Sequence, residues 1–391
     1  MSANPELKGK TYLLTNRTDE ANASSIGDGV LFFNLGLLSR IENEAEIAYV
    51  LGHELAHNKL NHVTKGMIKR VETITSKEFK EKEDEALKSE YNAVHQLMQF
   101  HKAALFDFNK HGRADETEAD SIGMIWAAKA GYSPEYATVM LLQLDSLEEE
   151  KYTDKIDYDK IFSTPDFKFK QEWLKGEAFL KAFKSKSEVE KELRNDTVND
   201  HPDNNLRATT VANLLARGNY HGNDGTSSLK NTLAIEADFE VIEFQYQAEA
   251  YGPSLYNTLH LLQVFPDNVY LKAMVGKNLY FLYKSLKDRT FSFHTDLPHP
   301  YFSKNYNEFL YFINNLRSSE FAALANNYIK KNDIGKKDKS YEFATILCLS
   351  MTPEKTSIEN LVAGYTHEYP GTEEAKYLTE KLNPIKTTKK N

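Results

Sequence analysis

The stretch LGHELAHNKLNH, residues Leu51–His62, places three histidines and a glutamate inside one predicted helix. His53, Glu54 and His57 form an H-E-x-x-H pattern. Two histidines four residues apart lie one helical turn from each other, so both imidazoles can reach one metal ion. Glu54 projects beside them, where its carboxylate can hold and deprotonate water. The pattern therefore predicts His53 and His57 as metal ligands and Glu54 as a catalytic base.

The residues upstream predict the start of this helix and a small sheet before it. Asn43 followed by Glu46 resembles a capping box, after which apolar residues recur at helical spacing. Residues 11–34 alternate β-branched and aromatic residues with turn formers, and we expect two or three strands there. The last of them, Gly29–Phe33, is either a core strand or an edge strand that binds an extended peptide by main-chain pairing.

A third metal ligand is needed, because an H-E-x-x-H match arises by chance in a chain like this on the order of a few per cent of the time. The metzincin pattern, H-E-x-x-H-x-x-G-x-x-H, would require a glycine and a histidine where this chain has Leu60 and Val63. His62 is one place short of that histidine position. We interpret it as a packing or surface histidine.

A second predicted helix supplies a carboxylate instead. Glu116 and Asp120 lie four residues apart in RADETEADSIGMIWAAKAGY, residues 113–132. One carboxylate can bind the metal while the other accepts a hydrogen bond from the distal nitrogen of a metal-bound histidine. We expect the neighbouring Asp115 and Glu118 to be solvated surface residues.

Composition narrows the class of protein. The 391 residues include 57 acidic and 48 basic side chains, so nothing in general favours nucleic acid or anionic lipid as a partner. No apolar run approaches the roughly 18 residues of a spanning helix, and the first residues lack the apolar core of a secretory signal. We expect no transmembrane segment in this chain. The single cysteine, Cys348, excludes an internal disulfide and a thiolate metal cluster.

The length of the chain favours more than one domain. We predict a first domain over residues 1–217, with a helical hairpin at 64–110 and an insertion at 151–200. Glycine, asparagine and serine cluster at 218–228 and predict a linker. Residues 229–391 have an almost entirely helical pattern. The predicted fold class is α+β and mostly helical, with a small β-sheet in the first domain and an all-α second domain.

The second domain contains two similar stretches. FPDNVYLK from Phe265 and YPGTEEAK from Tyr369 each place an aromatic residue, a proline and a turn ahead of a helix. Their separation is about three periods of a ~34-residue helical repeat. We predict tetratricopeptide-like helix pairs, with a plain helical bundle as the alternative.

Several motifs together resemble a known family. The H-E-x-x-H helix, ETEAD followed by AGYSP, NAS before a strand, and LGLL all look like the HtpX and CAAX-prenyl-protease family of zinc metallopeptidases, peptidase family M48. The resemblance covers roughly residues 10–217. It implies a zincin-like domain with one Zn²⁺ ion held by His53, His57 and Glu116. It also implies that Asp120 is the outer hydrogen-bond partner of a ligand.

The resemblance gives a further meaning to DHPDNNLR, residues 200–207. The family has an H-P-x-x-x-x-R element, and His201 and Arg207 fall at that spacing. From the residues alone, this is an ordinary loop that leads into a helix. The resemblance implies that Arg207 stabilises a developing oxyanion and that His201 occludes or gates the metal.

The function implied by the resemblance is a zinc metalloendopeptidase that cleaves protein or peptide substrates in protein quality control. The helical domain would then bind a partner or a substrate. The helical tail resembles periplasmic members that handle outer-membrane assembly, so we expect an extracytoplasmic, periplasmic or membrane-associated bacterial protein in a trimmed or mature form. A cytoplasmic location is the alternative. The alternative is a chaperone-like binding protein whose zinc site is latent or structural, with His201 as a fourth ligand. A zinc hydrolase acting on a non-peptide substrate would use the same ligands.

Overall fold

The computed structural model describes residues 2–382 apart from several gaps. The gaps are residues 8, 10, 89–111, 148, 177–203, 224, 226–227, 301, 336 and 353–354. Contacts between residues divide the chain into two compact units. The first comprises Met1–Lys151 and Ser185–Val241, and the second comprises Tyr152–Lys184 and Ile242–Asn391.

The sheet of the first unit has three strands, β1 (Tyr12–Asn16), β2 (Ala23–Gly27) and β3 (Val30–Asn34). Their order is β1-β3-β2, and β3 is parallel to β1 and antiparallel to β2. Asp28 and Gly29 turn the chain between β2 and β3 with φ angles of 49° and 83°. Aspartate tolerates this left-handed region and glycine adopts it freely, so the pair suits a tight hairpin. The strands predicted from the sequence are confirmed.

β3 is the middle strand of the sheet. Of the two alternatives for Gly29–Phe33, the edge strand that binds a peptide is therefore wrong and the core strand is correct. Its backbone pairs with β1 on one side and with β2 on the other, which leaves neither side free. Leu31 and Phe33 are buried, as expected of a core strand. Among the described residues, the outer strands of this sheet are β1 and β2.

α2 (Glu44–Lys59) carries the H-E-x-x-H pattern and begins at the predicted capping box. The Asn43 side chain accepts a hydrogen bond from the Glu46 backbone N–H at 3.1 Å. The Glu46 side chain in turn accepts one from the Glu42 backbone N–H at 2.8 Å. The first bond satisfies a donor that the first turn of a helix leaves free, and the second ties the residue before the N-cap to that turn. The predicted start of the helix is confirmed.

The second predicted helix is present and covers residues 112–129 of the described chain. It ends before Gly131, whose φ of 93° is a conformation that glycine adopts without strain. The other helices of this unit are η1 (Pro5–Leu7), α1 (Leu35–Leu38), α3 (His62–Thr75), α4 (Lys77–Lys88), α6 (Glu135–Leu147), α10 (Asn204–Arg217) and the first part of α11 (Ser228–Gln247). Helices α3 and α4 cover the start of the predicted hairpin, and the rest of it lies outside the described residues.

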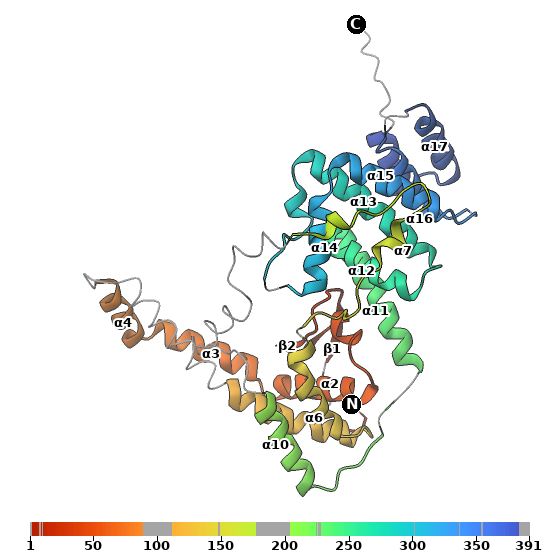
Figure 1. Ribbon diagram of the computed structural model, residues 1–391. Helices are drawn as coiled ribbons and strands as arrows, with labels where there is room; N and C mark the ends of the chain where they lie inside the picture. Colours follow the sequence, from red (N-terminus) through yellow and green to blue (C-terminus); the bar gives the residue numbers. More distant parts are fainter. Residues whose placement is uncertain are drawn as a thin grey trace. The chain divides into compact units, whose positions relative to one another are not determined.

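One apolar core joins the sheet to these helices. Its members come from β3, α1, α2, the 112–129 helix, α6 and α10 and from the turn after α1: Phe33, Leu37, Ile41, Tyr49, Val50, Met124, Ala137, Met140, Leu141, Ala208 and Val211. Burying a large apolar side chain contributes about 1.5–3 kcal/mol. In Figure 1, α2 lies beside α6 and below the strands. Because α2 is packed from several sides, the side chains on it have defined positions.

The regular elements described in the second unit are all helices. It contains α7 (Tyr158–Phe162), η2 (Gln171–Leu174), the end of α11, α12 (Tyr251–Val264), α13 (Val269–Asp288), η3 (Phe291–Phe293), α14 (Lys304–Asn315), α15 (Ser318–Lys331), α16 (Lys339–Leu349), α17 (Lys355–Glu368), α18 (Glu373–Tyr377) and η4 (Leu378–Leu382). Helix α13 packs against α12, α15 and α16. Asn268 caps α13 and Thr372 caps α18, so both predicted helix starts are confirmed. Tetratricopeptide-like pairing stays a prediction.

The first part of the predicted insertion, 151–200, packs inside the second unit. The rings of Phe162 and Trp173 lie 5.7 and 6.4 Å from the ring of Phe312 in α14, centroid to centroid. Burying such large rings is strongly favourable, which explains why this segment belongs with the helices of the second unit. Residues 177–203 lie outside the described part of the chain.

The boundary between the units lies within α11, after Val241, whereas we predicted a linker at 218–228. Ala237 and Val241 pack against Leu35 in the first unit. The carbonyl of the next residue, Ile242, accepts a hydrogen bond from a serine hydroxyl of α12 in the second unit. α11 therefore begins in the first unit and ends in the second.

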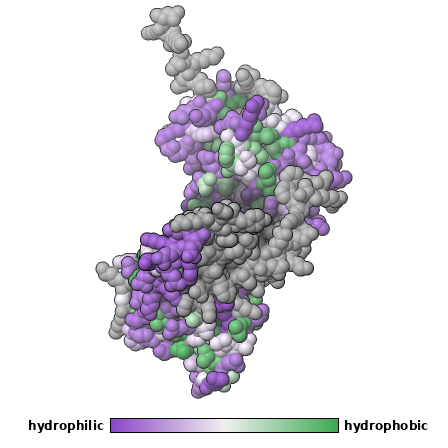
Figure 2. Space-filling model, turned by 90° about the vertical axis from the view of Figure 1, so that its left-hand side faces the viewer, coloured by the Kyte–Doolittle hydropathy of each residue, from purple (hydrophilic) through white to green (hydrophobic). Residues whose placement is uncertain are grey.

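The α+β, mostly helical fold class is confirmed, with its small sheet in the first unit. The zincin-like and tetratricopeptide-like assignments stay predictions. None of the helices in the described ranges is long and apolar enough to cross a bilayer. On the face shown in Figure 2, hydrophilic residues cover much of the coloured surface and hydrophobic ones are scattered between them.

Candidate metal centre

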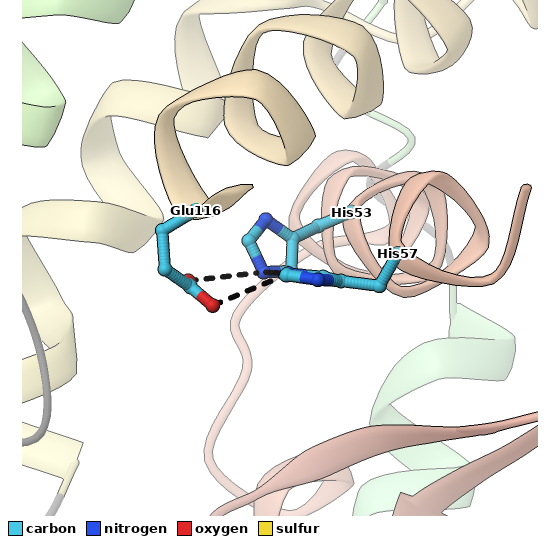
Figure 3. Close-up of side chains that lie close together, drawn as sticks. All are labelled: His53, His57 and Glu116. Atoms are coloured by element: carbon cyan, nitrogen blue, oxygen red, sulfur yellow. Dashed lines mark hydrogen bonds and ion pairs between the residues drawn. The ribbon is translucent and has the colours of Figure 1, made fainter. Parts of the chain in front are cut away.

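The side chains of His53, His57 and Glu116 converge on one point between α2 and the 112–129 helix (Figure 3). The two histidine Nε2 atoms are 3.0 Å apart. The Glu116 carboxylate oxygens lie 3.5 Å from His53 Nε2 and 3.3 Å from His57 Nε2. The three residues that the sequence proposed as ligands, on two helices distant in the chain, are thus brought together.

These residues fit a divalent metal ion. Two imidazole nitrogens and one carboxylate oxygen lie within 4.8 Å of one another, a donor set that zinc prefers. Both histidines direct Nε2 inward, so their Nδ1 atoms point to partners outside the site. Among the described residues this group has three ligands, the number that catalytic zinc sites use together with a water or substrate in the fourth position.

A close helix crossing sets the distance between the ligands. Gly52 in α2 and Gly123 in the 112–129 helix meet backbone to backbone. A Cβ atom at either position would lie less than 3 Å from backbone atoms of the opposite helix. Glycine at both positions lets the helices approach closely enough for His53 and Glu116 to reach one ion. No pattern in the sequence had indicated that Gly52 and Gly123 meet.

Asp120 lies behind His53 and is almost fully buried. Its Oδ1 atom is 2.9 Å from His53 Nδ1, which matches the predicted role of outer hydrogen-bond partner. The Tyr49 hydroxyl donates a second hydrogen bond to the same carboxylate at 2.8 Å. Tyr49 precedes His53 by four residues, so helical spacing was a signal that could have identified it.

Arg207, at the start of α10, binds the same carboxylates. Its Nε and Nη2 atoms donate to Asp120 at 2.8 and 2.7 Å, a bidentate pair, and Nη2 lies 3.0 Å from Glu116. The Arg207 guanidinium is bound by these two acids. Its predicted contact with an oxyanion stays a prediction. His201, the other residue of the H-P-x-x-x-x-R element, lies outside the described residues.

The charges of these groups depend on one another. Burial opposes a charge on His53, but hydrogen bonds to Asp120 and Glu116 outweigh burial and raise the pKa of His53 to about 10. Burial would raise the pKa of both acids. Hydrogen bonds from His53 and His57 hold the pKa of Glu116 well below its usual value, and bonds from Arg207 and His53 lower that of Asp120. In the metal-free protein the site therefore holds a proton on His53.

Glu54 lies beside the ligands, close to β2. Burial raises the pKa of its carboxyl above the usual value, against the opposing effect of His53 and His57. The backbone N–H of Ser25 in β2 donates a hydrogen bond to this carboxylate. A carboxylate that is partly removed from water is a stronger proton acceptor, which suits the predicted base.

His62 is buried rather than on the surface, and it contacts a proposed ligand. Its Nδ1 atom lies 3.1 Å from Nδ1 of His57, and its Nε2 atom lies 3.4 Å from Glu118 and 3.7 Å from Asp115. Glu118 is exposed, as expected, and Asp115 is half-buried, but both face this histidine. Counting along the metzincin pattern could not detect this contact, because it depends on the turn between α2 and α3.

Taken together, a histidine pair on one helix, a carboxylate from a second helix and a half-buried glutamate beside them form an arrangement typical of H-E-x-x-H metal-dependent hydrolases. The sequence profile of peptidase family M48 matches residues 2–215, which is more than half of the chain. The chain therefore belongs to this family. The resemblance seen in the sequence is confirmed. Membership in a metallopeptidase family implies a metal ion, which His53, His57 and Glu116 are placed to hold.

A curated relative agrees with this assignment. The mitochondrial metalloendopeptidase OMA1 of Arabidopsis thaliana is 29% identical to this chain over 135 residues. The match covers 32% of this chain and 24% of that protein. The chain therefore aligns with only about a quarter of the length of this relative.

Proposed function

We propose that this protein is a zinc-dependent metalloendopeptidase that cleaves peptide bonds within protein substrates and acts in protein quality control. The observation that carries the proposal is the convergence of His53, His57 and Glu116 beside the half-buried Glu54, in a member of a peptidase family. The name of the OMA1 relative, a metalloendopeptidase, supports the endopeptidase activity.

The residues of the chain have separate tasks in this reaction. A zinc ion at the site would act as a Lewis acid that polarises the substrate carbonyl and makes water more acidic. The Glu54 carboxylate takes the proton from the attacking water and passes it to the leaving amide nitrogen. Asp120 orients His53, and Arg207 holds Asp120 and Glu116 in place through its hydrogen bonds.

The substrate would bind along β2 rather than β3. β2 is an outer strand that pairs with β3 on one side, and it packs against α2. The backbone N–H of Ser25 points from β2 to Glu54, so the strand runs beside the proposed base. An extended peptide that adds to this strand by main-chain hydrogen bonds would place a peptide bond next to Glu54 with little sequence specificity.

The all-helical second unit is proposed to bind a substrate or a partner protein. An extracytoplasmic location in a bacterium is proposed from the resemblance to repeat-bearing periplasmic relatives. The alternative, a chaperone-like protein with a structural zinc site, would need a fourth protein ligand. The proposed fourth ligand, His201, lies outside the described residues, so zinc content and activity have to separate the two interpretations.

The test compares wild type with Glu54→Gln. Both proteins should hold one zinc ion per chain, measured by elemental analysis, because Glu54 is not a ligand. Casein hydrolysis should fall about 100-fold or more in the variant, the usual contribution of an acid–base group. Glu72→Gln, on the exposed face of α3, is the matched control and should keep full activity. Equal hydrolysis by wild type and Glu54→Gln would refute the proposed function.

A further inference from the structure

The contact between His57 and His62 restricts where the hydrogens of both rings can be. Their Nδ1 atoms are 3.1 Å apart, which is a hydrogen-bond distance. One of the two nitrogens must carry a hydrogen and the other must offer its lone pair, since two N–H groups or two lone pairs would repel each other.

The metal site decides which nitrogen is the donor. Nε2 of His57 faces His53 and Glu116, so it needs its lone pair to bind a metal ion. A neutral imidazole then carries its hydrogen on Nδ1, and the acceptor that the described part of the chain offers to this N–H is Nδ1 of His62. The hydrogen of His62 must therefore be on Nε2, which faces the carboxylates of Glu118 and Asp115.

The local fold holds His62 in place for this contact. α2 ends at Lys59, and Asn61 adopts a left-handed conformation with a φ of 56° before α3 begins at His62. This turn brings the His62 ring against His57, with 5.0 Å between the ring centroids. His62 is 6% exposed, so water does not compete strongly for the bond.

We propose that His62 is a positioning residue that fixes the tautomer and the ring orientation of His57. It serves His57 as Asp120 serves His53, so that each histidine ligand has its own hydrogen-bond acceptor. The proposal rests on the proposed function, because it takes His57 as a metal ligand. Contacts from Glu118 to His62 and from His62 to His57 then connect an exposed carboxylate with the proposed metal site.

The same hydrogen positions argue against a second metal ion. His62, Asp115 and Glu118 form a second group that is close enough to hold one. A metal on His62 Nε2 would displace the hydrogen that faces Glu118. His62 would then have to carry a hydrogen on Nδ1, opposite the N–H of His57, or become an anionic imidazolate. We therefore expect one high-affinity zinc ion per chain.

Two variants of nearly equal size test the proposal. Leucine and asparagine have the same branched shape, but only asparagine offers an oxygen near the position of His62 Nδ1. Zinc affinity is measured by competition with a chromophoric chelator. His62→Leu should raise the zinc dissociation constant roughly 10–100-fold, the usual effect of losing such a partner. His62→Asn should keep most of the affinity. Nitrogen-15 spectra of histidine-labelled, zinc-loaded wild type should show His57 protonated on Nδ1 and His62 on Nε2.

The possible outcomes separate the inference from the proposed function. Wild-type affinity in His62→Leu, or an equal loss in both variants, would overturn the positioning role, because the first shows no contribution and the second a packing effect. Two tightly bound zinc ions in wild type and one in His62→Leu would also overturn it. If wild type binds zinc but is no more active than Glu54→Gln, the proposed function fails while the affinity comparison still tests His62.

Discussion

Gly52 and Gly123 bring two helix backbones into contact beside the metal centre. A Cβ atom built on Gly52 would lie 2.7 Å from the carbonyl oxygen of Gly123, and one built on Gly123 would lie 2.6 Å from the backbone nitrogen of His53. Real Cβ atoms are essentially never found so close to backbone atoms. The separation of His53 and Glu116 therefore depends on two positions that have no side chain.

Gly123→Ala should force the helices apart. We expect a loss of about 1–3 kcal/mol in the free energy of unfolding, the usual cost of overpacking, together with weaker zinc binding. Urea titration and chelator competition measure the two effects. Gly66→Ala in α3 is the control, because a Cβ there meets nothing within 4 Å and alanine favours a helix. Equal stability and zinc affinity in wild type and Gly123→Ala would contradict this account of the crossing.

Arg207→Lys should impair the site although it keeps the positive charge. A lysine ammonium cannot reproduce the two parallel hydrogen bonds that the guanidinium donates to Asp120. The buried acids would be left partly unpaired, and we expect a destabilisation of a few kcal/mol. Thermal unfolding of the metal-free protein measures it. Arg217→Lys, at the exposed end of the same helix, should have little effect, and an equal shift in both variants would contradict the prediction.

Zinc binding should release a proton from His53. The pKa of this residue is about 10 in the metal-free protein, so at neutral pH the proton must leave before Nε2 can bind zinc. Below that pKa, each unit of pH increase should raise zinc affinity about tenfold. Calorimetry in buffers of different ionisation enthalpy measures the proton released. Asp120→Asn removes a charge that raises this pKa and should flatten the dependence. An affinity independent of pH between about 6.5 and 8 would contradict the prediction.

His260 in α12 should make the second unit sensitive to acid. Burial lowers its pKa to about 4. Its Nε2 atom has no hydrogen-bond partner among the described residues, and the ring stacks on Tyr152 at 4.1 Å. The unfolded chain takes up the proton near pH 6.5 and the folded one only near pH 4, so stability falls as pH drops through this range, by about 3 kcal/mol in total.

The control for this prediction is His260→Phe, which keeps the stacked ring and removes the titrating group. Urea unfolding of wild type should become easier between pH 7 and about 4.5, more steeply than in the variant. Parallel curves for the two proteins would show that His260 is not responsible.

The metal centre was largely predictable because helix geometry is local. Residues four apart lie on one face, so the spacing of His53 with His57 and of Glu116 with Asp120 indicated both pairs of groups before any contact was known. The same reasoning could have found Tyr49, four residues before His53. The second helix had to be assigned by chemistry, as the source of a carboxylate, because nothing local says which helices meet.

The sequence by itself determined the composition of the site and the helices that carry it, because side-chain periodicity and helix caps act over a few residues. Only the tertiary structure decided that β2 rather than β3 is an outer strand beside Glu54, that Gly52 and Gly123 touch, and that His62 contacts His57. Each of these depends on how separate elements pack, and packing is set by the combined shape and burial of many side chains rather than by any one stretch of sequence.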